Sequence, residues 1–268
     1  MERERAAEQV VLAVGGHPDD IEFMMAGTLL LLKEAGAPIH MWSMTDGSLG
    51  STSTDRVRTA AMRLDEACAS ARIAGAAFHG PIARDMELVC SVELVSRAAA
   101  VIRRASPRIL LLPAPEDYHP DHRNASSVAL SAVLAARLPA YQSRPPVPPL
   151  EAGVAIYHAL PFGLRDPMGK VIEAGQYVDV TGELDHKTRM LAAHESQRDW
   201  LLASQGVDCL GVMEEMSREL GRASGAFEYA EGWRRRLYVG FSAEEGDPLS
   251  ELLGPLCLTR ADGRYLKE

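Results

Sequence analysis

The sequence predicts an α/β fold in which a twisted, mostly parallel sheet carries helices on both faces. Short apolar runs alternate with longer segments of helical periodicity along the first half of the chain, the order from which parallel sheets are built. Two clusters of histidine and aspartate follow directly after two of the apolar runs, where open α/β sheets hold their ligands. With 268 residues, 47% of them hydrophobic and 24% charged, the chain is long enough for one large domain.

The first half of the chain gives four strand–helix units. Residues 10–14 are an apolar run typical of a buried parallel strand, and residues 23–35 are apolar on most faces, which predicts a buried helix. Pro38 introduces the next strand, and a loop rich in Gly, Ser and Thr follows it. Later helices carry apolar residues at helical spacing, the first of them with Thr54 as its N-cap. The remaining strands are expected at 39–45, 77–79 and 109–112, and the helices at 56–73, 92–104 and 124–137.

The second half of the chain is less regular. Residues 144–149 contain four prolines and predict a stiff connector at the edge of the core or at a domain seam. Strands are expected at 154–158 and 177–180, helices at 182–196 and 211–221, and a loop-like, then mildly apolar tail from residue 243. We expect residues 1–268 to form a single domain, with a core over about 10–200 and an accessory or oligomer-forming region over 201–268.

Composition argues against several classes of function. The formal net charge of −9 disfavours nucleic acid or an anionic membrane as partner, because both require a basic surface. The four cysteines are far apart, as expected of free thiols in a reducing cytoplasm, and no apolar stretch approaches the ~20 residues that span a bilayer. The pair Gly15-Gly16 lacks the further glycines of a dinucleotide site. We therefore expect a cytoplasmic protein that acts on a small molecule.

The first polar cluster follows the strand at 10–14. His17 and Asp20 flank Pro18, whose fixed φ helps to hold an imidazole and a carboxylate toward one point. The adjacent carboxylates of Asp19 and Asp20 repel each other, and a bound cation would offset that repulsion. Such residues also occur in ordinary turns and helix caps, so this cluster alone does not establish a metal site.

The second polar cluster, Tyr118-His119-Pro120-Asp121-His122, follows the strand at 109–112. Together the clusters offer two imidazoles and a carboxylate, from His17, His122 and Asp20, which leaves coordination positions free, as in catalytic zinc sites. Non-haem iron(II) enzymes use the same ligand types, so the choice between Zn²⁺, Fe²⁺ and other divalent transition metals stays open.

The neighbours of these ligands favour hydrolysis. Asp19 lies beside a ligand and is placed to take a proton from a water molecule that the metal activates. His119 is suited to the opposite side of the substrate, where it would stabilise an oxyanion or protonate a leaving amine. Asp121 would orient either His119 or a ligand histidine.

These residues resemble the LmbE-like, or PIG-L, family of zinc-dependent N-acetylglucosamine deacetylases. The likeness covers about residues 10–197 in the same order and has a weaker echo at residues 226–231. It is carried by Gly16-His17-Pro18-Asp19-Asp20 with Glu22, by His119-Pro120-Asp121-His122, and by Thr45-Asp46-Gly47, residues 62–67 and Ala193-His194-Glu195-Ser196-Gln197. The last of these motifs is similar to the bacillithiol-type and diacetylchitobiose-type branches.

The resemblance implies a Rossmann-like fold with the site at the carboxyl ends of the strands. It implies that His17, Asp20 and His122 bind zinc, that Asp19 is the general base, and that His119 is the acid or oxyanion stabiliser with Asp121 as its partner. Arg63, Asp85 and His194 match positions associated with the substrate. Asp117 stands where mycothiol-type deacetylases have a tyrosine, so the substrate contacts of that branch are not carried over.

The expected function is removal of an acetyl group from an N-acetylglucosamine-containing small molecule or glycoside, by a homo-oligomer such as a trimer or hexamer. Three alternatives remain at this point: an amidase for another amide such as a thiol conjugate, a catalytically silent sugar-binding relative, and an iron(II) oxygenase.

Overall fold

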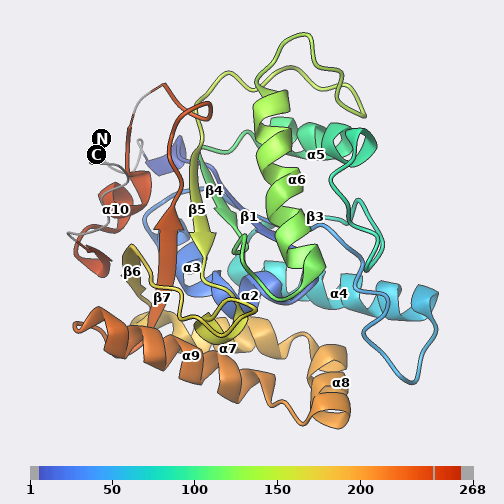
Figure 1. The fold of residues 1–268 in the computed structure, drawn as a ribbon, viewed down its shortest axis with the longest axis vertical. Helices are drawn as coiled ribbons and strands as arrows, with labels where there is room; N and C mark the ends of the chain where they lie inside the picture. The colour runs from blue at the N-terminus through green and yellow to red at the C-terminus, as the bar shows by residue number, and fades with distance from the viewer. Residues whose placement is uncertain (1–5, 244, 261–268) are drawn as a thin grey trace.

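A computed structural model describes residues 6–243 and 245–260 of the chain, and within these ranges the predicted α/β class is confirmed (Figure 1). The strands form one eight-stranded sheet in the order β3-β2-β1-β4-β5-β7-β6-β8. The first five strands of that order are parallel, whereas β7, β6 and β8 pair antiparallel. The strands are β1 (Val11–Gly15), β2 (Ile39–Ser43), β3 (Ala77–His79), β4 (Ile109–Leu112), β5 (Ala155–Ala159), β6 (Gln176–Asp179), β7 (Ala230–Arg235) and β8 (Cys257–Thr259).

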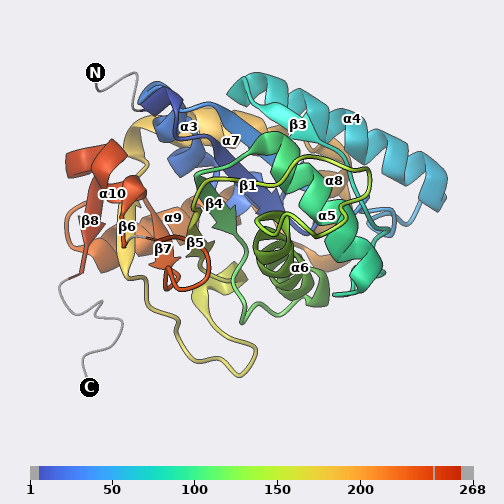
Figure 2. The same ribbon diagram turned by 90° about the horizontal axis from the view of Figure 1, so that it is seen from above.

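Helices cover both faces of the sheet (Figure 2). On one face lie α3, α4, α7 and α10, and on the other lie α5 and α6, which pack against each other. The helices are α2 (Asp20–Met24), α3 (Ala26–Glu34), α4 (Arg56–Ala74), α5 (Val92–Ala105), α6 (Pro120–Ala136), α7 (Leu184–Ala192), α8 (Glu195–Gln205), α9 (Cys209–Ser224) and α10 (Pro248–Leu253). None of the helices in the described ranges has the length and apolar character needed to cross a membrane.

Strand β1 lies near the middle of the sheet and is buried on both faces. Val11 and Ala13 point into the core formed with α3, and Leu12 and Val14 point into the core formed with α5 and α6. Burial on both sides explains why the run is apolar throughout rather than alternating. The parallel partners of β1 are β2 and β4, so both polar clusters emerge at the same edge of the sheet.

Several predicted boundaries were wrong, for identifiable reasons. The helix expected at 23–35 is divided at Met25, because the buried Glu231 carboxylate accepts hydrogen bonds from the Gly27 and Thr28 amides and caps a new helix, α3. Asp55, not Thr54, is the N-cap of α4, since its side chain accepts from the Arg58 amide.

Two other helices also differ from expectation. Helix α6 begins four residues before the predicted start at 124, because Pro120 occupies its first position and needs no amide partner there. His119 is therefore its N-cap. The helix expected at 182–196 ends at Ala192, and α8 is a separate helix.

Four elements, β7, α8, α10 and β8, were not predicted from the sequence. Strand β7 was missed because its first four residues, which include Glu231 and Gly232, are all buried and show no alternation. It nevertheless lies inside the sheet, between β5 and β6. Residues 261–268 of the expected tail lie outside the described ranges. The predicted division of the domain at about residue 200 stays a prediction.

Candidate active site

A cavity of about 380 Å³ opens at the carboxyl ends of β1 and β4. Loops after these two strands, together with α2, the start of α6 and α8, contribute its walls. The lining includes most of the residues that the sequence singled out: His17, Asp19, Asp20, Arg63, Asp85, His119 and His122. Open α/β sheets hold ligands at this edge, so the cavity is the natural candidate site.

The loop after β1 is shaped by Asp20. Its Oδ2 accepts hydrogen bonds from the amides of Gly16 and His17 at 2.7 and 2.8 Å, which folds the loop back onto the start of α2. Asp19, at the N-cap of α2, has a φ of 109°, a left-handed conformation that costs a non-glycine residue about 1–3 kcal/mol. Strain of this kind is typical of functional sites.

Gly16 allows the two polar clusters to meet. A side-chain carbon at this position would lie 3.1 Å from the Asp121 carbonyl carbon and 3.1 Å from the His122 ring. Any larger residue would push the start of α6 away from the loop after β1.

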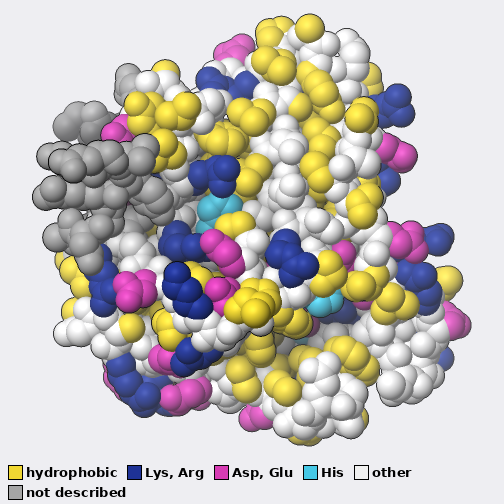
Figure 3. All heavy atoms as spheres, in the orientation of Figure 1, with side chains coloured by type: hydrophobic (Ala, Val, Ile, Leu, Met, Phe, Trp, Pro, Cys, Tyr) yellow, Lys and Arg dark blue, Asp and Glu magenta, His cyan; other side chains and the backbone are white. Residues whose placement is uncertain are grey.

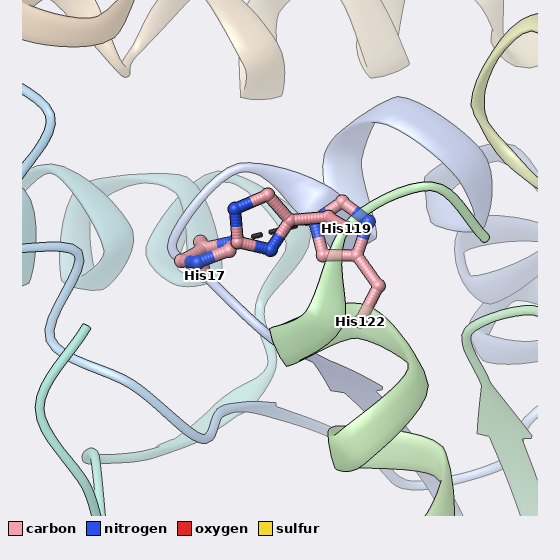
Figure 4. A group of neighbouring side chains, drawn as sticks. All are labelled: His17, His119 and His122. Atoms are coloured by element: carbon pink, nitrogen blue, oxygen red, sulfur yellow. Dashed lines mark hydrogen bonds between the residues drawn. The ribbon is translucent and has the colours of Figure 1, made fainter. Parts of the chain in front are cut away.

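A nitrogen of His17, a nitrogen of His122 and the carboxylate of Asp20 lie close together; Figure 4 shows the two imidazoles. His17 Nδ1 is 3.2 Å from His122 Nε2, His122 Nε2 is 3.1 Å from Asp20 Oδ1, and His17 Nδ1 is 3.8 Å from Asp20 Oδ2. Tetrahedral zinc with bonds of about 2.0–2.1 Å separates its ligand atoms by about 3.3 Å. Both the spacing and the donor set therefore fit a metal ion of this kind.

Carboxylates hold the far side of both histidine rings. His17 Nε2 lies 3.3 Å from Asp121 Oδ2 and 3.4 Å from Asp85 Oδ1, while His122 Nδ1 lies 2.8 Å from Asp117 Oδ1. This arrangement fixes each ring so that its other nitrogen faces the triad. The buried group His17, Asp85 and Asp121 is also compact enough to hold a cation, but it shares His17 Nε2, which we assign to orientation of the ring.

The same contacts perturb the protonation of the triad. Burial lowers the pKa of His17, but hydrogen bonds to Asp121, Asp20 and Asp85 outweigh it and raise the pKa well above its ordinary value. Burial also lowers the pKa of His122, yet the charge of Asp20 and the bond to Asp117 raise it to about 9. For Asp20, burial is outweighed by His122 and His17, so its pKa is well below the usual range. The surrounding carboxylates thus favour positive charge at these side chains, carried either by protons on the imidazoles or by a metal ion that replaces those protons.

Asp19 faces Arg63 on the other side of the loop. Its Oδ2 lies 3.2 Å from Arg63 Nη2, and the buried guanidinium also donates to the carbonyls of Pro18 at 2.5 Å and Gly47 at 3.0 Å. Burial raises the pKa of Asp19, Arg63 lowers it, and the neighbouring charge of Asp20 raises it again, with a net increase. A carboxyl group of raised pKa suits proton transfer.

His119 lines the cavity beside the two other histidines, with its ring centroid 4.6 Å from that of His17 (Figure 4). Its Nδ1 accepts a hydrogen bond from the Asp121 amide at 3.2 Å, so Nε2 is the nitrogen that carries the proton in the neutral ring. The Asp121 carboxylate itself faces His17 and the Met86 amide. Burial and the charges of His17 and His122 lower the pKa of His119.

Arg63, Asp85 and His194, the residues matched to substrate positions, lie in different surroundings. Arg63 and Asp85 line the cavity, although each is less than a tenth exposed and is engaged with a site residue. His194 is fully buried, with Nε2 3.0 Å from Glu22 Oε1, and is not part of the cavity lining.

Three kinds of residue at the site were not assigned a role from the sequence. Asp117 was noted only as a departure from another branch, yet a carboxylate five residues before a candidate ligand histidine is a signal for an orienting partner. Gln197 donates to the Gly50 carbonyl at 2.8 Å and lines the cavity, as do the apolar Phe162 and Trp200. The apolar residues carry no local signal, because any core would use them.

The chain is similar to several known proteins. The family described as PIG-L, GlcNAc-PI de-N-acetylase, matches residues 12–133. The chain is 31% identical over 193 residues to the diacetylchitobiose deacetylase of Thermococcus kodakarensis, covering 70% of this chain and 69% of that protein. It is 26% identical over 204 residues to a probable N-acetyl-alpha-D-glucosaminyl L-malate deacetylase 2 of Bacillus cereus, covering 73% and 86%.

Solved structures show the same fold. The N,N'-diacetylchitobiose deacetylase from Pyrococcus horikoshii superposes with a TM-score of 0.73 at 25% identity, over 90% of this chain and 88% of that one. GalB, a 4-carboxy-2-hydroxymuconate hydratase from Pseudomonas putida, superposes with a TM-score of 0.69 at 20% identity, over 89% and 99%. Because a hydratase shares the fold, the reaction must be argued from the site and not from the architecture.

Proposed function

Since this chain belongs to the PIG-L, or LmbE-like, family, we propose that it is a metal-dependent N-deacetylase that removes the acetyl group from an N-acetylglucosamine-containing small molecule or glycoside. The observation that carries the proposal is that one cavity holds both a group of candidate metal ligands and further side chains suited to proton transfer. The side chains of His17, Asp20 and His122 converge. Asp19, which pairs with Arg63, and His119, whose ring nitrogen lies within 4.8 Å of nitrogens of the other two histidines, line the same cavity.

His17, Asp20 and His122 would hold the metal, which we propose to be zinc. When bound, such a metal lowers the pKa of a water molecule and polarises the carbonyl of the scissile amide. Asp121, Asp85 and Asp117 would keep the two imidazoles oriented by accepting their outer N–H groups.

Asp19 is the proposed general base. Its carboxylate would take the proton that the attacking water loses, and the Arg63 guanidinium would hold that carboxylate in position. The raised pKa of Asp19 makes the protonated form accessible during the reaction.

His119 is the proposed acid. Its Nε2–H would donate a hydrogen bond to the oxyanion as the tetrahedral centre forms. As the C–N bond breaks, the leaving amine nitrogen would receive the proton that Asp19 took from the water, relayed through His119 Nε2, so that both side chains return to their starting protonation states. The products are acetate and the free amino sugar, with the oxygen of the water in the acetate.

The test is acetate release from a panel of N-acetylglucosaminides by protein that retains its metal. We expect turnover by the native chain, about one transition metal per chain, and loss of both metal and activity in His17→Ala and His122→Ala. Val57→Ala, at a residue 81% exposed, serves as the control and should change neither. A folded, metal-loaded protein that released no acetate from any member of the panel would overturn the proposal.

We also propose a homo-oligomer, such as a trimer or hexamer, in the cytoplasm. Within the described residues β8 is the edge strand of the sheet. Leu258 in β8 and Leu256 just before it are each 37% exposed, which suits contact with another copy. The four cysteines are unpaired, in keeping with a reducing compartment.

A further inference from the structure

We propose that one side of the cavity is a subsite for a hydrophobic, aryl-type aglycone attached to the amino sugar; this inference rests on the proposed deacetylase function. We call this subsite the apolar arm and define it by Phe23, Phe162, Trp200, Leu201 and Val207, all of which line the cavity. The arm names the class of glycoside that the site would prefer.

The first wall of the arm is the face of α8 that lines the cavity. In α8 the cavity-lining residues are Gln197, Trp200, Leu201 and Gln205, which follow the i, i+3, i+4, i+8 spacing of one helix face. Gln197 is the one buried residue of this helix, whereas Trp200 and Leu201 are only half-buried. The two apolar residues of this face, Trp200 and Leu201, therefore face the cavity between two glutamines and do not pack into a protein core.

The opposite wall is a row of aromatic rings that starts at His119. The ring centroids of Tyr118 and His119 are 5.7 Å apart, those of Tyr118 and Phe162 are 5.9 Å apart, and those of Phe162 and Phe23 are 5.4 Å apart. Tyr118 is 57% exposed and Phe162 38% exposed. In Figure 3 hydrophobic side chains border the lower of the two histidine patches on this face.

The position of this row tells which part of the substrate enters the arm. His119 is the proposed donor to the leaving amine, and the amine remains on the sugar after the reaction. A surface that continues from His119 is thus on the sugar side of the amide and would meet the substituents of the sugar, not the acetyl group.

The chemistry of the walls favours an apolar occupant over a second sugar. Hydroxyl groups buried without partners lose about 1–3 kcal/mol each in proteins. Among the described residues of the arm and of the α8 face, amide side chains come from Gln197 and Gln205, and Gln197 Nε2 is already bonded to the Gly50 carbonyl. An aryl ring would cover the exposed apolar surface and needs no such partner.

The experiment compares kcat/KM for the phenyl glycoside, the methyl glycoside and the β-1,4-linked disaccharide of N-acetylglucosamine, with acetate release as the readout. We expect the phenyl glycoside to exceed the methyl glycoside by about tenfold or more, the factor for burying part of one aromatic ring. In Trp200→Ala this ratio should fall to about one. Leu202→Ala is the matched control on the same helix, because Leu202 is 60% exposed and does not line the cavity, and it should keep the native ratio.

Two results would overturn the inference. Equal kcat/KM for the phenyl and methyl glycosides would mean that the arm holds no aglycone. A disaccharide preferred to the phenyl glycoside, with the preference lost in Trp200→Ala, would mean that the arm binds a second sugar.

If the proposed deacetylase function itself is wrong, no glycoside will release acetate, which distinguishes that outcome from failure of the apolar-arm inference. In that case calorimetry with the phenyl glycoside decides the matter: binding that weakens about tenfold or more in Trp200→Ala supports the arm, and no measurable binding refutes it.

Discussion

The buried ion pair between Lys187 of α7 and Glu231 of β7 offers a quantitative test of how the core supports the site. Lys187 is 1% exposed and Glu231 2% exposed, and Lys187 Nζ lies 2.7 Å from Glu231 Oε1. The same carboxylate accepts from the Gly27 and Thr28 amides at 2.9 and 2.8 Å, at the N-terminus of α3. Glu231 therefore ties α7 and β7 to α3, which comes directly after the short helix α2 that begins at Asp20.

We expect Lys187→Met to lower the free energy of unfolding by about 3 kcal/mol. Removing one partner of a buried pair typically costs ~3–5 kcal/mol, because the other charge stays buried without compensation. The two amides and the positive end of α3 still stabilise the Glu231 carboxylate, which places the loss at the lower end of that range. Glu231→Gln should lose more, about 4 kcal/mol, since it leaves a buried ammonium group facing an amide.

Urea unfolding followed by circular dichroism measures both variants, and a thermal scan should show a decrease in Tm of about 6–12 °C for Lys187→Met. The control is Arg222→Met, which removes a cation paired at 3.3 Å with Glu215 on the exposed side of α9 and should change stability by less than ~0.5 kcal/mol. The double variant Lys187→Met/Glu231→Gln should lose about 2 kcal/mol less free energy of unfolding than the sum of the losses in the two single variants. A native urea midpoint for Lys187→Met, or strict additivity in the double variant, would refute the reasoning.

Three further predictions concern the site, acid stability and assembly. Asp19→Asn should retain the metal by elemental analysis and lower kcat by about 10²–10⁴-fold, whereas Asp20→Asn should lose metal; the reverse order would mean that the two carboxylates exchange roles. Burial lowers the pKa of His158 to about 4, so the unfolded state, with a pKa near 6.5, takes up the proton first as pH falls. Between pH 7 and pH 5, preferential protonation of His158 in the unfolded state should lower the free energy of unfolding by about 2 kcal/mol. His158→Asn keeps a hydrogen-bond donor for the Pro113 carbonyl, and its urea midpoint should fall less over that pH interval than the midpoint of the native protein. Light scattering at micromolar concentration should give a mass above that of one chain, and a monomer mass would count against the proposed oligomer.

Local signals predicted the first half of the fold well. The strands at 77–79 and 109–112 were predicted with their observed bounds, because short apolar runs between helices leave little choice. The C-terminal half was harder, since β7 reads as a polar segment until Lys187 and the α3 amides are placed around Glu231. A glutamate in a sequence is normally taken for a surface residue. Burial of the Glu231 carboxylate is possible because partners that are distant in the sequence offset its desolvation cost.

The sequence by itself determined which groups could bind a metal and that they would meet. His17 and Asp20 lie between the end of β1 and the first residue of α2, and His119 and His122 lie at the start of α6. Each pair follows a strand of the parallel part of the sheet, so topology alone brings them to one edge. Histidine and aspartate side chains can bind a metal wherever they are brought together, so such candidates can be identified from the sequence alone.

Tertiary structure alone decided how those groups are held and what surrounds them. The pairing of His17 with Asp85 and of Asp19 with Arg63, and the apolar arm between α8 and Phe162, all join segments at least 33 residues apart. These side chains are of common types, and their role at the site depends on the distances to their partners and on burial. Those quantities are set by the packing of the whole domain, and no local pattern encodes them.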